Sequence, residues 1–266
     1  MSDVSWDNAP VILVLADVRF DTVSKMASYV DEIQDAMRKS GYPKFERKEA
    51  RKINLDLSSQ QHISEISYFW EFANKANTES FILSNDSLIF KTADYQHFES
   101  FKTVLKQGLD IVCRIADLAV GSCPRVGLRY VDAVQPPAGR SLSEYIKPGL
   151  LGFDFDDLAM ERKGGLSESY ADTERGRLVV KCWQGSGVGV PLPPDLASPP
   201  ILDLKPLVDI SKHHALLDFD NIHFDSIDFS ISGVMGVLDD LHADTSRAFL
   251  AASTPEAILD WSTGAS

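Results

Sequence analysis

The sequence has few cysteines and no long apolar run. Its three cysteines, Cys113, Cys123 and Cys182, are widely spaced and form no CxxC pair. An odd number of scattered cysteines argues against a zinc ribbon or a disulfide framework and fits a reducing cytoplasm. The apolar run at 11–15 stops before Asp17, far short of a membrane span, and no signal-peptide pattern accompanies it. We therefore expect a cytosolic protein without a membrane segment.

Positive charge is also scarce. The chain has 26 lysines and arginines against 39 acidic residues, which gives a net charge of −13. Such a surface repels phosphate backbones, so nucleic-acid binding is disfavoured, although a local basic patch could still support it. The main patch consists of Arg38, Lys39, Lys44, Arg47, Lys48, Arg51 and Lys52. A solvated surface is its simplest interpretation, and a docking site for an acidic partner or a nucleic acid is the alternative.

Standard catalytic and cofactor-binding motifs are missing. The patterns GxGxxG, GxxxxGK[ST], HExxH, GxSxG and DxDxDG do not occur. We therefore expect no cofactor, and the sequence favours a non-catalytic protein over an enzyme without deciding between them.

Hydrophobic periodicity alternates between strand and helix patterns. Strands are predicted at 11–20, 67–72, 80–83, 87–90, 125–134, 166–170, 177–183, 215–220 and 224–229. Amphipathic helices are predicted at 22–39 after Asp21, at 95–119 after Asp94, and after Ser232, with shorter ones at 142–146 and 257–261. This order predicts an α+β fold, in which long amphipathic helices cover one face of an antiparallel or mixed sheet.

The best candidate for a boundary is Pro136-Pro-Ala-Gly139. It separates an N-terminal α+β half, residues 1–135, from a C-terminal α+β half, residues 140–266. Each half places strands before a long amphipathic helix, although no residue-level repeat is visible. The pattern suggests two related halves that share one continuous sheet.

The clearest strand, Arg125–Val134, carries two arginines inside an otherwise apolar run. If both of its faces are buried, Arg129 needs an acidic partner, because an isolated buried charge is very costly. Asp17, on the first predicted strand, is the expected partner in a structural ion pair. The alternative is that Arg125 or Arg129 grips a phosphate or carboxylate of a ligand.

Two aspartates and a histidine lie close together near the C-terminus. Strand alternation places Asp218 and Asp220 on one face, and with His223 they could hold a hard divalent metal for hydrolysis. No further ligand on a fixed element is evident, so we expect no metal site. An exposed strand end explains the two acids equally well.

Several short motifs follow one another in a distinctive order. They are Asn8-Ala-Pro10, Val18-Arg-Phe20, Trp70-Glu-Phe72, Gly127-Leu-Arg-Tyr-Val-Asp132, Leu217-Asp-Phe-Asp220 and Leu238-Asp-Asp-Leu-His242. This order resembles a sporadically distributed family of uncharacterised prokaryotic proteins, whose hallmarks are an Asn-Ala-Pro start and a Leu-Arg-Tyr-hydrophobic-Asn strand. Asp132 departs from that pattern, which has asparagine there. The resemblance implies no settled activity, but its patchy distribution suggests a defence or toxin–antitoxin setting.

Three functions stay open. The leading hypothesis is a non-catalytic binding or regulatory module of a bacterial cytosolic system, acting through contacts with another protein. The second is a metal-dependent hydrolase or nuclease that uses Asp218, Asp220 and His223. The third is a nucleotide or RNA binder that uses Arg125, Arg129 and the 38–52 patch. The oligomeric state is left open, a homodimer included.

Overall fold

The computed structural model describes residues 8–56, 61–153, 160, 162–186, 192–193, 195–196, 202, 209 and 211–263, with the backbone alone at 50–56 and 61–67. The strands are β1 (Val11–Arg19), β2 (Lys44–Asp56), β3 (Gln61–Ala73), β4 (Glu79–Leu83), β5 (Ser87–Thr92), β6 (Ser122–Cys123), β7 (Arg125–Val134), β8 (Gly164–Asp172), β9 (Arg177–Gly185), β10 (His214–His223) and β11 (Ile227–Asp228). The helices are α1 (Met26–Lys39), α2 (Phe98–Ala116), α3 (Pro148–Leu151), α4 (Ile231–Ala252) and α5 (Pro255–Thr263).

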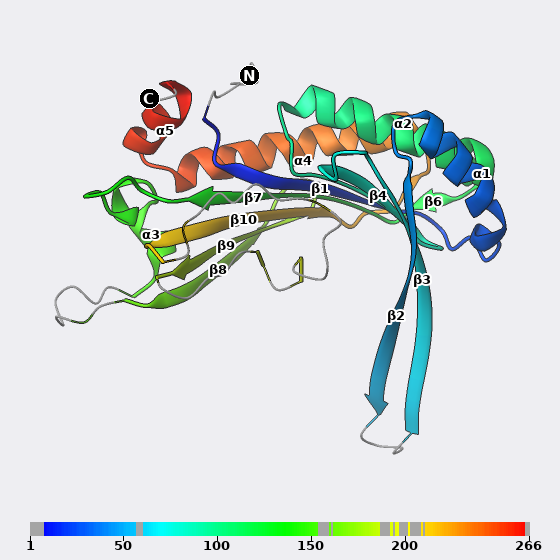
Figure 1. Cartoon of the computed structure of the whole chain (residues 1–266), viewed down its shortest axis with the longest axis horizontal. Coiled ribbons are helices and arrows are strands. Elements are labelled where there is room, and N and C mark those ends of the chain that lie inside the picture. The colour runs from blue at the N-terminus through cyan, green and yellow to red at the C-terminus, as the bar shows by residue number, and fades with distance from the viewer. Residues whose placement is uncertain are drawn as a thin grey trace.

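Nine of these strands form one antiparallel sheet in the order β2-β3-β4-β5-β1-β7-β10-β9-β8. The long helices α1, α2 and α4 lie together on one face of this sheet (Figure 1). The predicted α+β class is therefore confirmed, and the sheet is antiparallel.

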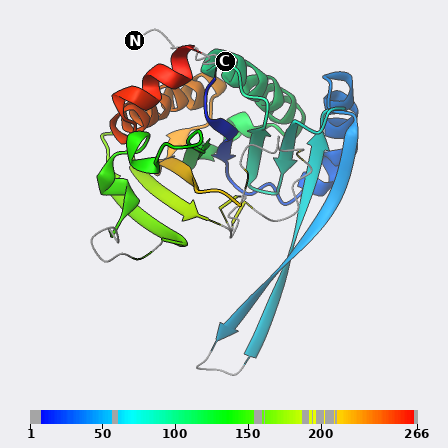
Figure 2. The same ribbon diagram turned by 60° about the vertical axis from the view of Figure 1, so that its left-hand side comes forward.

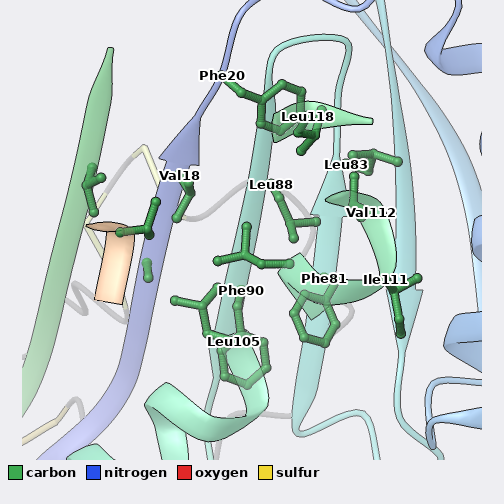
Figure 3. Close-up of a cluster of buried hydrophobic side chains, with 14 of the residues drawn as sticks. Val18, Phe20, Phe81, Leu83, Leu88, Phe90, Leu105, Ile111, Val112 and Leu118 are labelled. Carbon is green, nitrogen blue, oxygen red and sulfur yellow. The ribbon is translucent and has the colours of Figure 1, made fainter. Parts of the chain in front are cut away.

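The main core fills the space between the sheet and the long helices. Alternate residues of β1, namely Val14, Ala16 and Val18, point into it, as the two-residue period of a strand requires. Figure 3 shows part of the cluster, where Phe81 and Phe90 stack with ring centroids 4.7 Å apart. Gly108 of α2 lies against the Phe81 ring so closely that a Cβ atom would come within 2.2 Å of it. The missing side chain thus lets α2 approach the sheet.

Both predicted halves contribute to the sheet. Residues 1–135 supply the run β2-β3-β4-β5-β1-β7, and residues 140–266 supply β10-β9-β8. The strands β5 and β10 flank the central pair β1–β7, and each is the last strand of the large sheet before a long helix, α2 or α4. The relationship between the two halves stays a prediction.

Several predicted helix caps are wrong. The helix α1 begins at Met26, five residues beyond Asp21, whose side chain instead accepts a 2.7 Å hydrogen bond from the backbone N–H of Ser122. His97 caps α2 in place of Asp94, and Ser230 caps α4 in place of Ser232. A cap must reach the free N–H groups of the first turn, and the tertiary path of the chain decides which nearby side chain does so.

The strands β2 and β3 form a ribbon that extends well beyond the rest of the sheet (Figure 1, Figure 2). They pair from Lys44↔Ala73 to Asp56↔Gln61, whereas β3 pairs with β4 only over Trp70–Ala73. The basic segment that follows Gly41 therefore lies on an edge strand, which the sequence analysis did not predict. Within the described part of the chain, no helix is long and apolar enough to cross a membrane.

Candidate functional site

The sheet face opposite α1, α2 and α4 carries a set of charged residues, and we call it the polar face. Asp17 and Arg19 of β1 point to this face, and so do Arg125 and Arg129 of β7 and Asp218 and Asp220 of β10. The register of the ladder sets Arg19 directly opposite Arg125, and Arg129 opposite Asp220. Strand pairing thus assembles one charged patch from three segments that are far apart in the sequence.

A pocket of about 410 Å³ lies on the polar face. Its charged lining consists of Asp17, Arg19, Lys91, Arg125, Arg129, Asp195 and Asp220. Its apolar lining consists of Leu13, Leu15, Ile82, Ile89, Leu192, Leu196 and Leu202, and Gly127 completes it. Among the described residues, this lining carries four cations and three carboxylates, in a chain whose net charge is −13. The described part of this lining includes no aromatic side chain.

Arg129 is buried and fully engaged by two carboxylates. Its Nε and Nη2 donate to the two oxygens of Asp218 at 2.7 and 2.8 Å, and its Nη1 and Nη2 donate to Asp195. Asp218 is only 1% exposed. Burial alone would lower the pKa of Arg129, but the hydrogen bonds to Asp218 and Asp195 outweigh it and raise that pKa. Arg129 therefore links β7, β10 and Asp195.

The prediction that Arg129 pairs with Asp17 is wrong. Asp17 stands opposite Gly127 in the ladder, and its carboxylate lies near Arg19 and Arg125 instead. The sequence did not reveal that β10 flanks β7 on its other side, and Asp218 on that strand is the partner that Arg129 takes.

Arg125 and Arg19 both contact Asp17, and only weakly. Their distances to Asp17 are 3.5 and 3.4 Å, longer than the roughly 2.7–2.9 Å of a good charge-assisted hydrogen bond. Arg19 has a second contact with Asp86 at 3.9 Å. The Nε of Arg125 is buried and donates to no partner among the described residues. Two opposed guanidinium groups on one sheet face repel each other, so this pair is poorly compensated.

A second ionic cluster borders the pocket. Glu71, 1% exposed, contacts Lys91 at 3.2 Å and accepts hydrogen bonds from Lys48 and from the Ser80 hydroxyl. Burial lowers the pKa of Lys91, and the contact with Glu71 only partly offsets this. Sequence reasoning missed Glu71 and Lys91, although charged residues inside predicted strands are a signal that could have found them.

The predicted basic patch does not form one site with Arg125 and Arg129. Arg38 and Lys39 pair with Asp35 on α1, and Lys44 bonds to Asn77. Arg47 lies over the Tyr68 ring at 4.3 Å, and Lys48 belongs to the Glu71 cluster. For Arg51 and Lys52 the described residues include only the backbone, in β2.

The three metal-ligand candidates are not brought together. Asp218 and Asp220 share the polar face, but His223 lies an odd number of positions from both, so its side chain points to the opposite face. Its Nδ1 lies beside the carbonyl oxygen of Arg175. Among the described residues, no group of three His, Cys, Asp or Glu side chains could hold a metal ion. Strand parity alone already argues against this set.

Asp132 is buried on the helix side of the sheet. It stands opposite Leu217 in β10, which in turn stands opposite Cys182. Burial, with a smaller contribution from Asp218, raises the pKa of Asp132 to about 8. The side chain is therefore mostly a neutral carboxylic acid at pH 7. A neutral acid offers one donor and one acceptor, much as an asparagine amide does.

We expect Arg129→Ala to lower the free energy of unfolding by about 3–5 kcal/mol, because it leaves Asp218 charged, buried and unpaired. Urea unfolding at neutral pH measures this. Arg177→Ala is the matched control, since its pair with Asp172 is exposed, and it should change the unfolding midpoint little. Equal unfolding midpoints for Arg129→Ala and the parent would contradict the structural role.

Asp132→Asn should change how stability depends on pH. Because the folded state holds a proton that the unfolded chain releases, the parent loses stability as pH rises from about 4 to about 8, by up to about 1.4 kcal/mol per unit. The variant lacks this loss, so its advantage over the parent should grow with pH in unfolding experiments. Asp209→Asn is the control, because hydrogen bonds from Ser211 lower the pKa of Asp209, so this carboxyl is ionised in both states above about pH 4 and the variant should differ from the parent by a constant amount across that range. A constant difference between Asp132→Asn and the parent would refute the proton assignment.

Comparison with known proteins does not assign the chain to a family. No family model matches the chain, and no curated protein is significantly similar to it. The resemblance to the sporadically distributed prokaryotic family therefore stays a prediction.

Proposed function

We propose that the protein is a binding module that takes up a small anionic ligand in the pocket on the polar face. Arg125 and Arg19 hold the anionic group. The buried Nε of Arg125, which donates to no partner among the described residues, is the observation that supports this proposal most directly. A buried donor without an acceptor costs about 1–3 kcal/mol, and a bound anion would remove that cost.

The two arginines of β7 have different roles in this proposal. Arg129 already makes four hydrogen bonds to Asp218 and Asp195. Arg125 has one ionic contact, at 3.5 Å, and its side chain is 30% exposed. A guanidinium gains most from an anion that can bind two of its N–H groups at once. Arg125 is therefore the ligand contact, and Arg129 is structural.

Charge favours a small anion over a nucleic acid. Inside a partly buried pocket, the attraction of Arg19 and Arg125 acts over a few ångströms and is weakly screened. An extended polyanion would also lie against the outer surface of the protein, and the net charge of −13 would repel it there. A ligand with one or two negative charges avoids most of this repulsion.

Replacing Arg125 tests the proposal. We expect a set of phosphate monoesters and monocarboxylates to include ligands that raise the melting temperature of the parent saturably. Arg125→Gln should weaken the binding of such a ligand at least about tenfold by calorimetry, since it removes a charge-assisted hydrogen bond. Arg175→Gln is the control, because Arg175 pairs with Asp240 outside the pocket lining. Unchanged affinity in Arg125→Gln, or no binding by the parent, would reject the proposal.

Contact with another protein is a second candidate function, and the β2–β3 ribbon favours it. No other described strand pairs with residues 61–69 of β3, so the ribbon stands apart from the sheet (Figure 2). A two-stranded hairpin is marginally stable in water unless something packs on it. At its base, Lys44, Phe45 and Arg47 are exposed, while the chain as a whole is acidic. We propose that a second copy of this chain, with its acidic surface, covers the ribbon.

Sedimentation equilibrium tests this association. We expect the parent to form dimers that salt weakens, because opposite charges bring the ribbon to the acidic surface. Arg47→Glu should lower the association constant at least about tenfold by placing like charges together. The control is Lys212→Glu, which changes the net charge equally at an exposed position outside the ribbon. A parent that stays monomeric at every concentration would exclude the dimer.

A further inference from the structure

Asp220 is a carboxylate of the pocket lining that lacks a cation of its own. It stands opposite Arg129 in the ladder between β7 and β10. Arg129, however, donates its hydrogen bonds to Asp218 and Asp195. Among the residues that the structure describes, Asp220 has no hydrogen bond and no ion pair. One guanidinium thus lies among three carboxylates, so this part of the polar face has an excess of negative charge.

Arg125 brings the opposite charge into the same pocket without reaching Asp220. Burial raises the pKa of Asp220, and the charges of Arg129 and Arg125 act against this shift. A guanidinium nitrogen of Arg125 lies 4.0 Å from the point where a Cβ atom of Gly127 would be. Gly127 stands opposite Ile222 and is therefore diagonal to Asp220. Because Gly127 has no side chain, it leaves space between the two opposite charges.

We propose that the ligand is a small zwitterion, whose anionic group binds Arg125 and Arg19 and whose primary ammonium group binds Asp220. This inference rests on the proposed anion site and adds a second charged group to its ligand. The ammonium group supplies the cation that Asp220 lacks. The anionic group accepts from the Nε of Arg125, a buried donor that finds no acceptor among the described residues. A purely anionic ligand would leave Asp220 uncompensated and would be repelled by it.

The register of the strands sets the length of this ligand. The guanidinium of Arg125 reaches the level of Gly127, and Asp220 lies one position further along the face. Neighbouring positions on one face of a strand are about 6.6 Å apart, so the two charged groups of the ligand lie roughly that far from each other. A spacer of two or three methylene groups suits this separation. Leu15, which stands opposite Arg129, offers apolar surface to such a spacer.

Two pairs of ligands test the ammonium group directly. Phosphoethanolamine and propyl phosphate differ only in a terminal ammonium or methyl group, and so do 4-aminobutyrate and pentanoate. In calorimetry at neutral pH, the ammonium ligand of at least one pair should bind the parent at least about tenfold more tightly than its methyl counterpart, because it adds a charge-assisted hydrogen bond. A smaller preference in every pair that binds would overturn the zwitterion and leave the anion site standing.

Asp220→Asn tests whether this carboxylate is the cause of the preference. The variant should reduce the preference for the ammonium ligand to about twofold or less, while the methyl counterpart binds at least as well as before, since a negative charge is removed. Circular dichroism should match the parent. Asp110→Asn is the matched control, because Asp110 is exposed on α2, and it should keep the preference. A preference that persists in Asp220→Asn would overturn the proposal.

Arg125→Gln separates the two proposals. It should weaken both members of a pair at least about tenfold, because both carry the anionic group. If the parent binds other phosphate monoesters or monocarboxylates but neither ammonium ligand, the zwitterion is wrong and the anion site stands. If no anion binds, the proposed function itself fails.

Discussion

The buried contact between Arg129 and Asp218 is the interaction on which the polar face depends. It joins β7 to β10 at the centre of the sheet, and Arg129 also bonds to Asp195. Each carboxylate offsets the cost of burying the guanidinium, since an unpaired charge at this depth would be very unfavourable. Because Arg129 and Lys91 are paired with buried carboxylates, Arg19 and Arg125 are the cations that we assign to the proposed ligand.

The same sheet separates two kinds of polar residue. On the polar face, charges are paired or line the pocket, and the buried Nε of Arg125 donates to no partner among the described residues. On the helix side, Asp132 is buried and its pKa is raised to about 8, so it behaves as a neutral group. A neutral carboxylic acid can both donate and accept a hydrogen bond, so at this position it resembles a side-chain amide more than a carboxylate.

The ribbon and the pocket occupy different parts of the sheet. The pocket lies on the polar face of the central strands β5, β1, β7 and β10, whereas the β2–β3 ribbon leaves the sheet at one edge (Figure 1). β3 and β4 connect the two, with Glu71 of β3 joining Lys48 at the base of the ribbon to Lys91 at the pocket. Glu71 thus contacts both the base of the ribbon and the lining of the pocket.

Local patterns in the sequence determined the α+β class, the long helices and the strands at 11–20 and 125–134, because hydrophobic periods of two and about 3.6 residues survive in any tertiary context. They also showed that Arg129 needs an acidic partner. They left β2 unseen, because charged residues dominate its first half and edge strands need little apolar character. Only the tertiary structure decided that β10 lies beside β7, so that Arg129 pairs with Asp218 and Asp17 is left between Arg19 and Arg125. Strand order joins residues far apart in the chain, and that choice depends on the packing of the whole sheet rather than on any local pattern.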